Sequence, residues 1–271
     1  MRRAVGAGVG TMNKLKTFAG KLGPRHMRQV LGQVKPRFRR MSGPAPYHAF
    51  SDYDDYWNQR KKLGGVMRRW ELAADAIRGP ASVLDVGCGS GEFLAYLRER
   101  HPDVALKGTD LSAVAVENTK AQGLDALVFD VVTEELKEEY DYITCFEVLE
   151  HLAEAETALR HIKNAFRRKL IVSIPNVGYI GCRLRLALFG RFPVTMCVYH
   201  IKEHLRHWTP KDFAEFMRRE GLRIESFEGQ YGPPWLPWRR MPGLFASGLV
   251  YVIVRGDAEE RIEGDTHRSN G

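Results

Sequence analysis

The chain has 271 residues, and 44% of them are hydrophobic, which is enough for one large domain with a buried core and some appendages. No uninterrupted apolar run approaches the roughly 20 residues that a helix needs to cross a bilayer. The four cysteines show no C-x-x-C spacing. They favour reduced thiols in a cytoplasmic protein over a disulfide framework or a zinc cluster.

The net charge of +8 comes from one end of the chain. Residues 1–51 contain eleven Lys or Arg and no acid, which leaves 30 basic and 33 acidic residues in the remainder. Proteins that bind double-stranded nucleic acid usually carry a basic face on the folded domain itself. The slightly negative remainder therefore argues against a nucleic-acid partner.

Residues 1–51 form a basic arm in which apolar residues recur at helical spacing. One short set is Leu15, Phe18 and Leu22, and a second runs from Met27 to Val34. Basic amphipathic helices often lie on anionic membrane surfaces, so peripheral membrane contact through this arm is one prediction. A disordered or packed extension, a true start at Met12 and a mitochondrial-type targeting peptide are the alternatives.

From residue 53 onward, strand and helix signals alternate along the chain, after a first helix predicted over Tyr53–Arg78. Strands are predicted at Ser82–Val86, Leu106–Thr109, Ala126–Phe129, Tyr142–Phe146 and Leu170–Ile174. The helices predicted between them are Glu92–Glu99, Ala113–Ala121 and Glu154–Phe166. The last third adds helices at Tyr179–Phe189 and Pro210–Glu220 and a closing strand pair at Arg223–Glu228 and Leu249–Val254.

This alternation predicts an α/β fold with a doubly wound sheet and helices on both faces. The sheet should be mostly parallel, because right-handed crossovers join its strands, with an antiparallel closing strand. The domain is expected to span residues 52–255, with insertions at 177–209 and 230–246. A polar tail, residues 256–271, is predicted to be disordered.

The segment from Val83 to Leu94 carries the strongest functional signal. An apolar strand runs into G-x-G-x-G, with glycines at Gly87, Gly89 and Gly91, and then directly into a helix. Dinucleotide enzymes place G-x-G-x-x-G at the same point, but here the spacing differs and the Lys-Ser/Thr of a P-loop is absent. Asp85 lies inside the strand, and such an acid suits a cationic ligand group such as an amino-acid ammonium.

Two further acids end the next strands. Asp110 ends the second strand, where a carboxylate accepts hydrogen bonds from both hydroxyls of a ribose, and Ser112 would cap the following helix. Asp130 ends the third strand, and it is placed either to accept from an adenine amino group or to cap a helix. Together these positions predict a site for a nucleoside-containing cofactor.

The series VLDVGCGSG, GTDLS, FDV and YDYITCFEVLEHL resembles the motif order of class I S-adenosylmethionine-dependent methyltransferases. The resemblance covers roughly residues 53–255 and implies a Rossmann-like fold that binds S-adenosylmethionine. It implies contacts of these motifs with the methionine end, the ribose, the adenine and the sheet edge. The implied cofactor-binding residues are Asp85, Gly87, Cys88, Gly89, Gly91, Asp110, Leu111, Asp130, Val131 and Phe146, with Arg60 before the core as a partner for the methionine carboxylate or an ordinary surface arginine.

Two sets of motifs resemble different subgroups of these methyltransferases. The segments IVSIPNVGY and RLRLALFGRFPVT are similar to MetW-type methionine-biosynthesis proteins. The pattern Glu147-x-x-Glu150-His151 resembles ubiquinone-biosynthesis O-methyltransferases and plant small-RNA 2′-O-methyltransferases. The expected function is methylation of a small molecule, most often on oxygen, such as a lipid, isoprenoid or glycan. A non-catalytic cofactor-binding regulator and an RNA ribose methyltransferase are the alternatives.

The acceptor side should lie where Glu147, Glu150 and His151 follow the fourth strand, with His204 further along the chain. In one interpretation His151 is a general base oriented by a neighbouring carboxylate. In another, these four residues bind Mg²⁺ or a similar divalent cation, and the mixed Glu/His set would also suit Mn²⁺, Fe²⁺ or Zn²⁺. In a third, E-V-L-E-H only caps the strand and pairs with arginines. The insertion at Pro233–Pro242 predicts a lid, an acceptor wall, a membrane-contacting loop or simply core tryptophans.

Overall fold

The computed structural model describes residues 52–59, 65–192, 204–233 and 235–256. The chain divides into two units, residues 1–44 and 45–271, and every described residue belongs to the second. The predicted arm at 1–51 lies outside the described residues, as do Arg60 and the predicted tail beyond Gly256.

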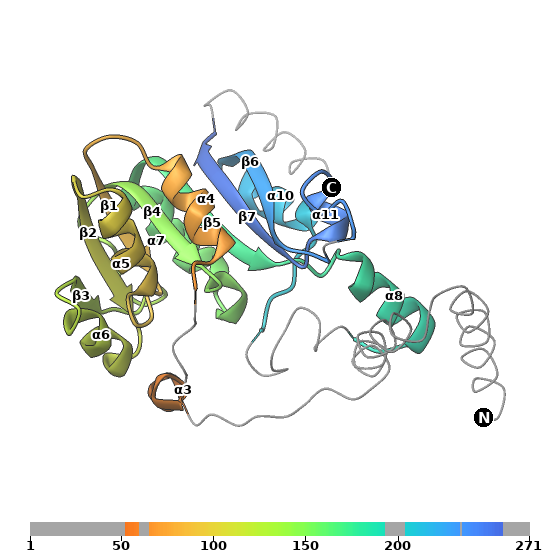
Figure 1. The fold of residues 1–271 in the computed structure, drawn as a ribbon, viewed down its shortest axis with the longest axis horizontal. Helices are drawn as coiled ribbons and strands as arrows, with labels where there is room; N and C mark the ends of the chain where they lie inside the picture. The colour runs from red at the N-terminus through yellow and green to blue at the C-terminus, as the bar shows by residue number, and fades with distance from the viewer. Residues whose placement is uncertain (1–51, 60–64, 193–203, 234, 257–271) are drawn as a thin grey trace, which may run out of the picture. The chain divides into compact units, whose positions relative to one another are not determined.

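Seven strands form one sheet in the order β3-β2-β1-β4-β5-β7-β6 (Figure 1). The neighbours β1 to β5 pair in parallel, whereas β7 is antiparallel to both β5 and β6. This confirms the predicted mostly parallel sheet with an antiparallel closing strand. The strands are β1 Ala81–Val86, β2 Val104–Asp110, β3 Asp125–Val128, β4 Tyr140–Phe146, β5 Phe166–Pro175, β6 Leu222–Tyr231 and β7 Gly248–Arg255.

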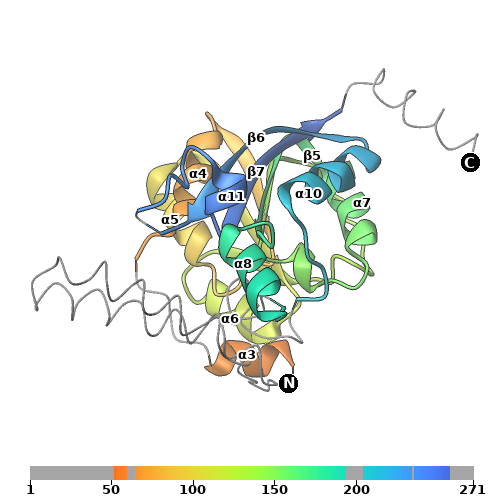
Figure 2. The same cartoon turned by 90° about the vertical axis from the view of Figure 1, so that its right-hand side faces the viewer.

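Helices cover both faces of the sheet (Figure 2). Alternate strand residues face opposite sides, so Val83 packs in a core cluster with α4 and α5, while Leu84 packs in another with α7 and α10. A capping box starts α10, with Thr209 and Asp212 bonded reciprocally. The helices are α3 Tyr53–Gln59, α4 Arg68–Ala76, α5 Glu92–Arg100, α6 Ala113–Lys120, α7 Ala155–Ala165, α8 Ile180–Phe189, α10 Pro210–Arg219 and α11 Pro242–Phe245, and Leu149–His151 form a 3₁₀ turn, η1.

The two predicted boundaries that differ most from the structure do so for local reasons, while others, such as the end of β6 at Tyr231, shift by up to three residues. The single helix predicted over Tyr53–Arg78 is two helices, because Gly65 has a φ of 93°, outside the helical range, and the second helix starts only at Arg68. Strand β5 begins at Phe166, which the sequence placed at the end of a helix. The three basic residues Arg167 to Lys169 interrupt the apolar pattern, so the sequence does not show that the strand starts before them. Phe166 itself is fully buried.

The carboxyl ends of the parallel strands bring the predicted site segments to one edge. Asn176, just after β5, is buried there, and its Nδ2 donates to the backbone oxygens of Gly243 and Ala246 at 3.0 and 2.8 Å. Its Oδ1 accepts from the Gly178 N–H at 2.8 Å. One amide thus joins the starts of α8 and of β7 at the edge. Among the described helices, none is long and apolar enough to span a membrane.

Candidate active site

The glycine loop between β1 and α5 has a backbone that only glycine adopts readily. Gly87 and Gly89 have φ values of 73° and 56°, in the left-handed region. A Cβ on Gly87 would lie 2.3 Å from the Val148 side chain. The loop is fastened to β2 because the amides of Gly87 and Cys88 both donate to the Thr109 carbonyl, at 2.7 and 2.9 Å. The missing side chains therefore let other groups approach the loop backbone closely, and the loop adjoins the segment after β4.

Asp110 holds the same loop from the end of β2. Its two carboxylate oxygens accept from the amides of Gly89 and Ser112, each at 2.9 Å. Burial raises the pKa of Asp110, although these two amides oppose that shift. Each carboxylate oxygen has a further lone pair, so both can still accept from a ribose hydroxyl. Ser112 also caps α6, as predicted, by accepting from the Ala115 amide.

Asp85 is a buried acid beside the loop, with an exposure of 2%. Its Oδ1 accepts from the Thr144 hydroxyl on β4 at 2.6 Å. Burial raises its pKa to about 7, the Thr144 hydrogen bond opposes the shift, and the Asp110 charge adds to it. A cationic ligand group at this position would favour the ionised carboxylate.

Helix α3 contacts both the glycine loop and the end of β2. The Trp57 indole lies so close that a Cβ on Gly89 would be 2.3 Å from its ring. Asp54 Oδ1 accepts from the Ser112 hydroxyl and, at 3.4 Å, from the Val114 amide at the start of α6. The sequence gave no sign of the Asp54 contact, because it joins residues 58 apart in the chain.

The other predicted cofactor positions surround this loop. Leu111 is 52% exposed beside Asp110, Val131 is buried, and the Phe146 ring packs edge-on against Phe93. Asp130 Oδ1 accepts from the Val132 amide at 2.9 Å, so it makes a turn and caps no described helix. The Cys88 thiol is turned toward the sheet, where a Cβ on Gly108 would lie 2.7 Å from its sulfur, so a ligand would meet the Cys88 backbone.

Glu147 has a φ of 55°, unusual for a residue other than glycine. Its Oε1 accepts from the Ser173 hydroxyl at 2.8 Å and from the Gln230 amide at 2.9 Å. Gln230, on β6, is 3% exposed. Neither partner carries a sequence signal, because they lie 26 and 83 residues from Glu147 in the chain. This carboxylate is thus engaged with β5 and β6.

Glu150, His151 and His204 come together at the sheet edge, and one ligand atom of each lies within 4.8 Å of the others. The two imidazole rings meet edge-to-face with centroids 4.6 Å apart. The approach is fixed by the backbone, since the Glu150 carbonyl accepts from the amides of Leu205 and Arg206 at 2.7 and 3.0 Å. Of the predicted four-residue set, Glu147 lies outside this cluster.

The cluster combines a buried acid with two partly buried imidazoles. Glu150 is 1% exposed, and neither carboxylate oxygen has a hydrogen-bond partner among the described residues. Burial and the nearby Glu147 raise its pKa well above the usual range. Burial, with smaller effects from His151 and His207, lowers the pKa of His204 to about 3, so this imidazole is neutral at pH 7. A buried carboxylate without a donor and a neutral imidazole fit a divalent cation.

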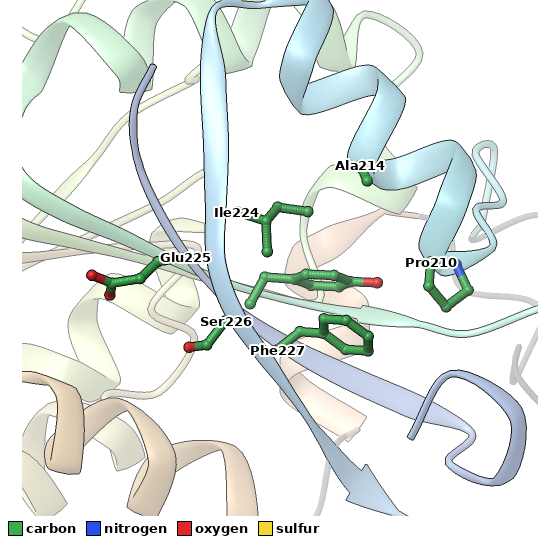
Figure 3. Close-up of a pocket in the computed structure, with 7 residues that line it drawn as sticks. Pro210, Ala214, Ile224, Glu225, Ser226 and Phe227 are labelled. Atoms are coloured by element: carbon green, nitrogen blue, oxygen red, sulfur yellow. The ribbon is translucent and has the colours of Figure 1, made fainter. Parts of the chain in front are cut away.

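A cavity of about 500 Å³ lies elsewhere, between α10 and β6 (Figure 3). None of the predicted site residues lines it, so the predicted chemistry does not belong to this cavity. Its walls are Pro210, Ala214, Ile224, Glu225, Ser226, Phe227 and Tyr251.

Fold and site together define a class I S-adenosylmethionine-dependent methyltransferase. The family model described as a methyltransferase domain matches residues 56–226, which is more than half of the chain. The chain belongs to this family and is an enzyme that uses S-adenosylmethionine.

Similar proteins agree with this class. The chain is 26% identical over 185 residues to a ubiquinone biosynthesis O-methyltransferase of Xanthomonas euvesicatoria, covering 64% of this chain and 73% of that protein. It is also 26% identical over 133 residues to a bifunctional methionine biosynthesis protein, MetXA/MetW, of Rhodopirellula baltica, covering 45% of this chain but 21% of that protein. In fold it is similar to magnesium protoporphyrin IX methyltransferase from Synechocystis with bound S-adenosylhomocysteine, with a TM-score of 0.51, 18% identity and coverage of 86% and 99% of the two chains.

Proposed function

We propose that this enzyme transfers the methyl group of S-adenosylmethionine to a hydroxyl oxygen of a small-molecule acceptor. The observation that carries the proposal is the buried Glu150 carboxylate, without a hydrogen-bond donor among the described residues and beside His151 and His204. Methyl transfer is an in-line displacement, so the enzyme must align the hydroxyl and help to remove its proton. A set of one acid and two imidazoles can do so.

The segment that carries Glu150 and His151 of the cluster contacts the glycine loop through Val148. Val148 is between Glu147 and Glu150 in the chain, and its side chain packs directly on Gly87. A methyl donor held by the glycine loop would therefore be near the segment that carries Glu150 and His151. This proximity supports assigning these residues to the acceptor side of the reaction.

Two chemical roles fit the cluster, and the structure favours the metal role. A general base needs only one imidazole, whereas a divalent cation accounts for the buried carboxylate and both imidazoles at once. With one oxygen and two nitrogen donors, the set suits Mn²⁺, Fe²⁺ or Zn²⁺ better than Mg²⁺. A bound cation would lower the pKa of an acceptor hydroxyl. Glu147, bonded to Ser173 and Gln230, would support the cluster from outside it.

The relatives support a small acceptor. The name of the Xanthomonas protein places it in ubiquinone biosynthesis as an O-methyltransferase. The sequence from residue 52 onward carries slightly more acidic than basic residues, which disfavours a nucleic-acid acceptor. The basic arm at 1–51 adds the proposal of peripheral membrane contact.

The test compares metal content and methyl transfer in Glu150→Gln, His204→Ala and a control, His161→Gln. His161 is also partly buried, but its Nδ1 contacts the Val131 carbonyl at 2.9 Å, away from the cluster. We expect the first two variants to lose bound metal and about 10²–10⁴ in transfer rate, while cofactor affinity and the control stay unchanged. A chelator should have the same effect on the wild-type enzyme. Full metal-free activity would refute the metal role, and a normal rate in both cluster variants would refute the site.

A further inference from the structure

Exposed large apolar side chains gather on the two insertions at the acceptor side, residues 177–209 and 230–246. Of the thirteen such side chains among the described residues, five lie in the first insertion and three in the second. The most exposed are Leu188, at 68%, and Trp235, at 60%. Soluble domains rarely gather apolar side chains in this way without a binding partner.

Helix α8 shows the pattern most clearly. Its Cys182 and Arg185 are buried, and Arg185 Nε donates to the Phe192 carbonyl at 2.9 Å, so this side faces the protein. Leu184 and Leu188, one turn apart, are 41% and 68% exposed. Arg183, on the same outer surface, is exposed as well. The helix thus presents leucines and arginine together to solvent.

Basic residues outnumber acidic ones in both insertions, and Glu203 is the one acid in the sequence of the two segments. No acid occurs between Asn176 and Lys202, and none occurs in residues 230–246, where Arg239 and Arg240 lie near Trp235. Arginine side chains reach a polar layer while their stems and the neighbouring leucines stay in an apolar one. Exposed leucine and tryptophan interleaved with arginine and free of acids match the headgroup and acyl layers of an anionic bilayer.

Both insertions leave the sheet at the edge that holds the acceptor side. Asn176 joins the start of the first insertion to the end of the second through its bonds to Gly178, Gly243 and Ala246. Phe192, 47% exposed, stacks on His207, three residues beyond the cluster residue His204. A surface bound to these insertions would therefore lie beside the cluster.

We propose that the described parts of the two insertions, residues 177–192, 204–209, 230–233 and 235–246, form a docking surface for an anionic lipid bilayer. The residues of this surface lie outside the basic arm at 1–51 in the sequence. The proposed bilayer contact is supported by the exposure of the apolar side chains and by the basic charge of the insertions. The corollary that the acceptor is reached at the membrane rests on the proposed function of the neighbouring cluster.

The test is sedimentation of the full chain with phosphatidylcholine vesicles, with and without phosphatidylglycerol. High salt screens the attraction of the arm and leaves the apolar contribution. The double variant Leu184→Asp/Leu188→Asp is compared with Val128→Asp, at a position whose exposure (51%) lies between those of the two leucines, on the outermost strand β3. We expect the double variant to lose at least about tenfold in vesicle partitioning at high salt, and Val128→Asp to match the wild type.

Quenching of tryptophan fluorescence by vesicles with brominated acyl chains locates the contact. We expect quenching in the wild type and loss of most of it in Trp235→Phe. The proposal fails if the double variant partitions like the wild type, or if Trp235→Phe is quenched as strongly as before. It also fails if the same leucines drive a dimer without lipid, since a second copy would then cover the surface. Cofactor binding by the double variant should be unchanged, so failure here leaves the proposed function intact.

Discussion

Replacing Asp85 with Asn should abolish a pH dependence of cofactor binding that the buried carboxylate imposes. In the unliganded protein, burial raises the pKa of Asp85 to about 7 from an ordinary value of 3.8. If the ionised form holds the ammonium of S-adenosylmethionine, the protein must release a proton on binding below pH 7. From the fraction ionised at each pH, affinity should fall roughly 15-fold between pH 7 and pH 5.5. The cofactor ammonium stays charged throughout this range.

The pH dependence of folding stability runs in the direction opposite to that of cofactor affinity. Because the folded-state pKa of Asp85 lies above the unfolded value, its contribution favours folding at low pH and is lost as the pH rises from about 4 through 7. The ionised, unliganded carboxylate then costs on the order of 4 kcal/mol. Asp85→Asn should therefore be more stable than the wild type at pH 8 without cofactor, while it binds the cofactor more weakly. Asn keeps an oxygen for the Thr144 hydroxyl, so the fold should tolerate it.

Calorimetry in two buffers of different ionisation enthalpy measures both affinity and proton release. Near pH 7 the wild type should release about half a proton per cofactor bound, and Asp85→Asn close to none. Thermal unfolding of the unliganded proteins at pH 5.5 and pH 8 checks the stability side. If Asp85→Asn keeps the wild-type fall in affinity between pH 7 and pH 5.5, Asp85 does not contact the cation and its assignment is wrong.

Two further changes test the cofactor site and the arm. Asp110→Ala should lower S-adenosylmethionine affinity about 10- to 150-fold, through loss of the ribose contact and of the bond to the Gly89 amide; calorimetry on folded protein with near-normal affinity would refute the ribose role. A chain starting at Ser51 should bind anionic vesicles at low salt more weakly than the full chain, because it lacks eleven positive charges. Equal co-sedimentation of the two would exclude a membrane role for the arm.

The parts of this protein that could be predicted from sequence are those that local chemistry specifies. A tight turn after a strand needs particular residues within a few positions of each other, so the sequence alone identifies Gly87, Gly89 and Asp110 as candidate site residues. The doubly wound, mostly parallel sheet followed from the alternation of strands and helices and from right-handed crossovers. Residues that act through distant partners gave no such sign. The clearest case is Gln230, which bonds to Glu147 from 83 residues away.

The division of Tyr53–Arg78 into two helices was missed for a different reason. Its apolar spacing is compatible with one helix, and the break depends on the backbone of Gly65 and on where Trp57 packs. Trp57 lies on the glycine loop, so α3 is placed by a tertiary contact that helical periodicity cannot express. Similarly, His204 reaches His151 only because the Glu150 carbonyl holds the chain after residue 204.

The side chain of Asn176 connects the two segments that we propose to form the acceptor side. Three short bonds from one amide fix the departure of α8 and the return into β7. The glycine loop follows β1, whereas these three bonds join residues after β5 to residues before β7. If these segments bind the acceptor, as proposed, changes in residues 177–209 and 230–246 should alter acceptor preference and leave the glycine loop unchanged. A graft of both segments into a relative should carry Asn176 along, because without it the two loops lose their common anchor.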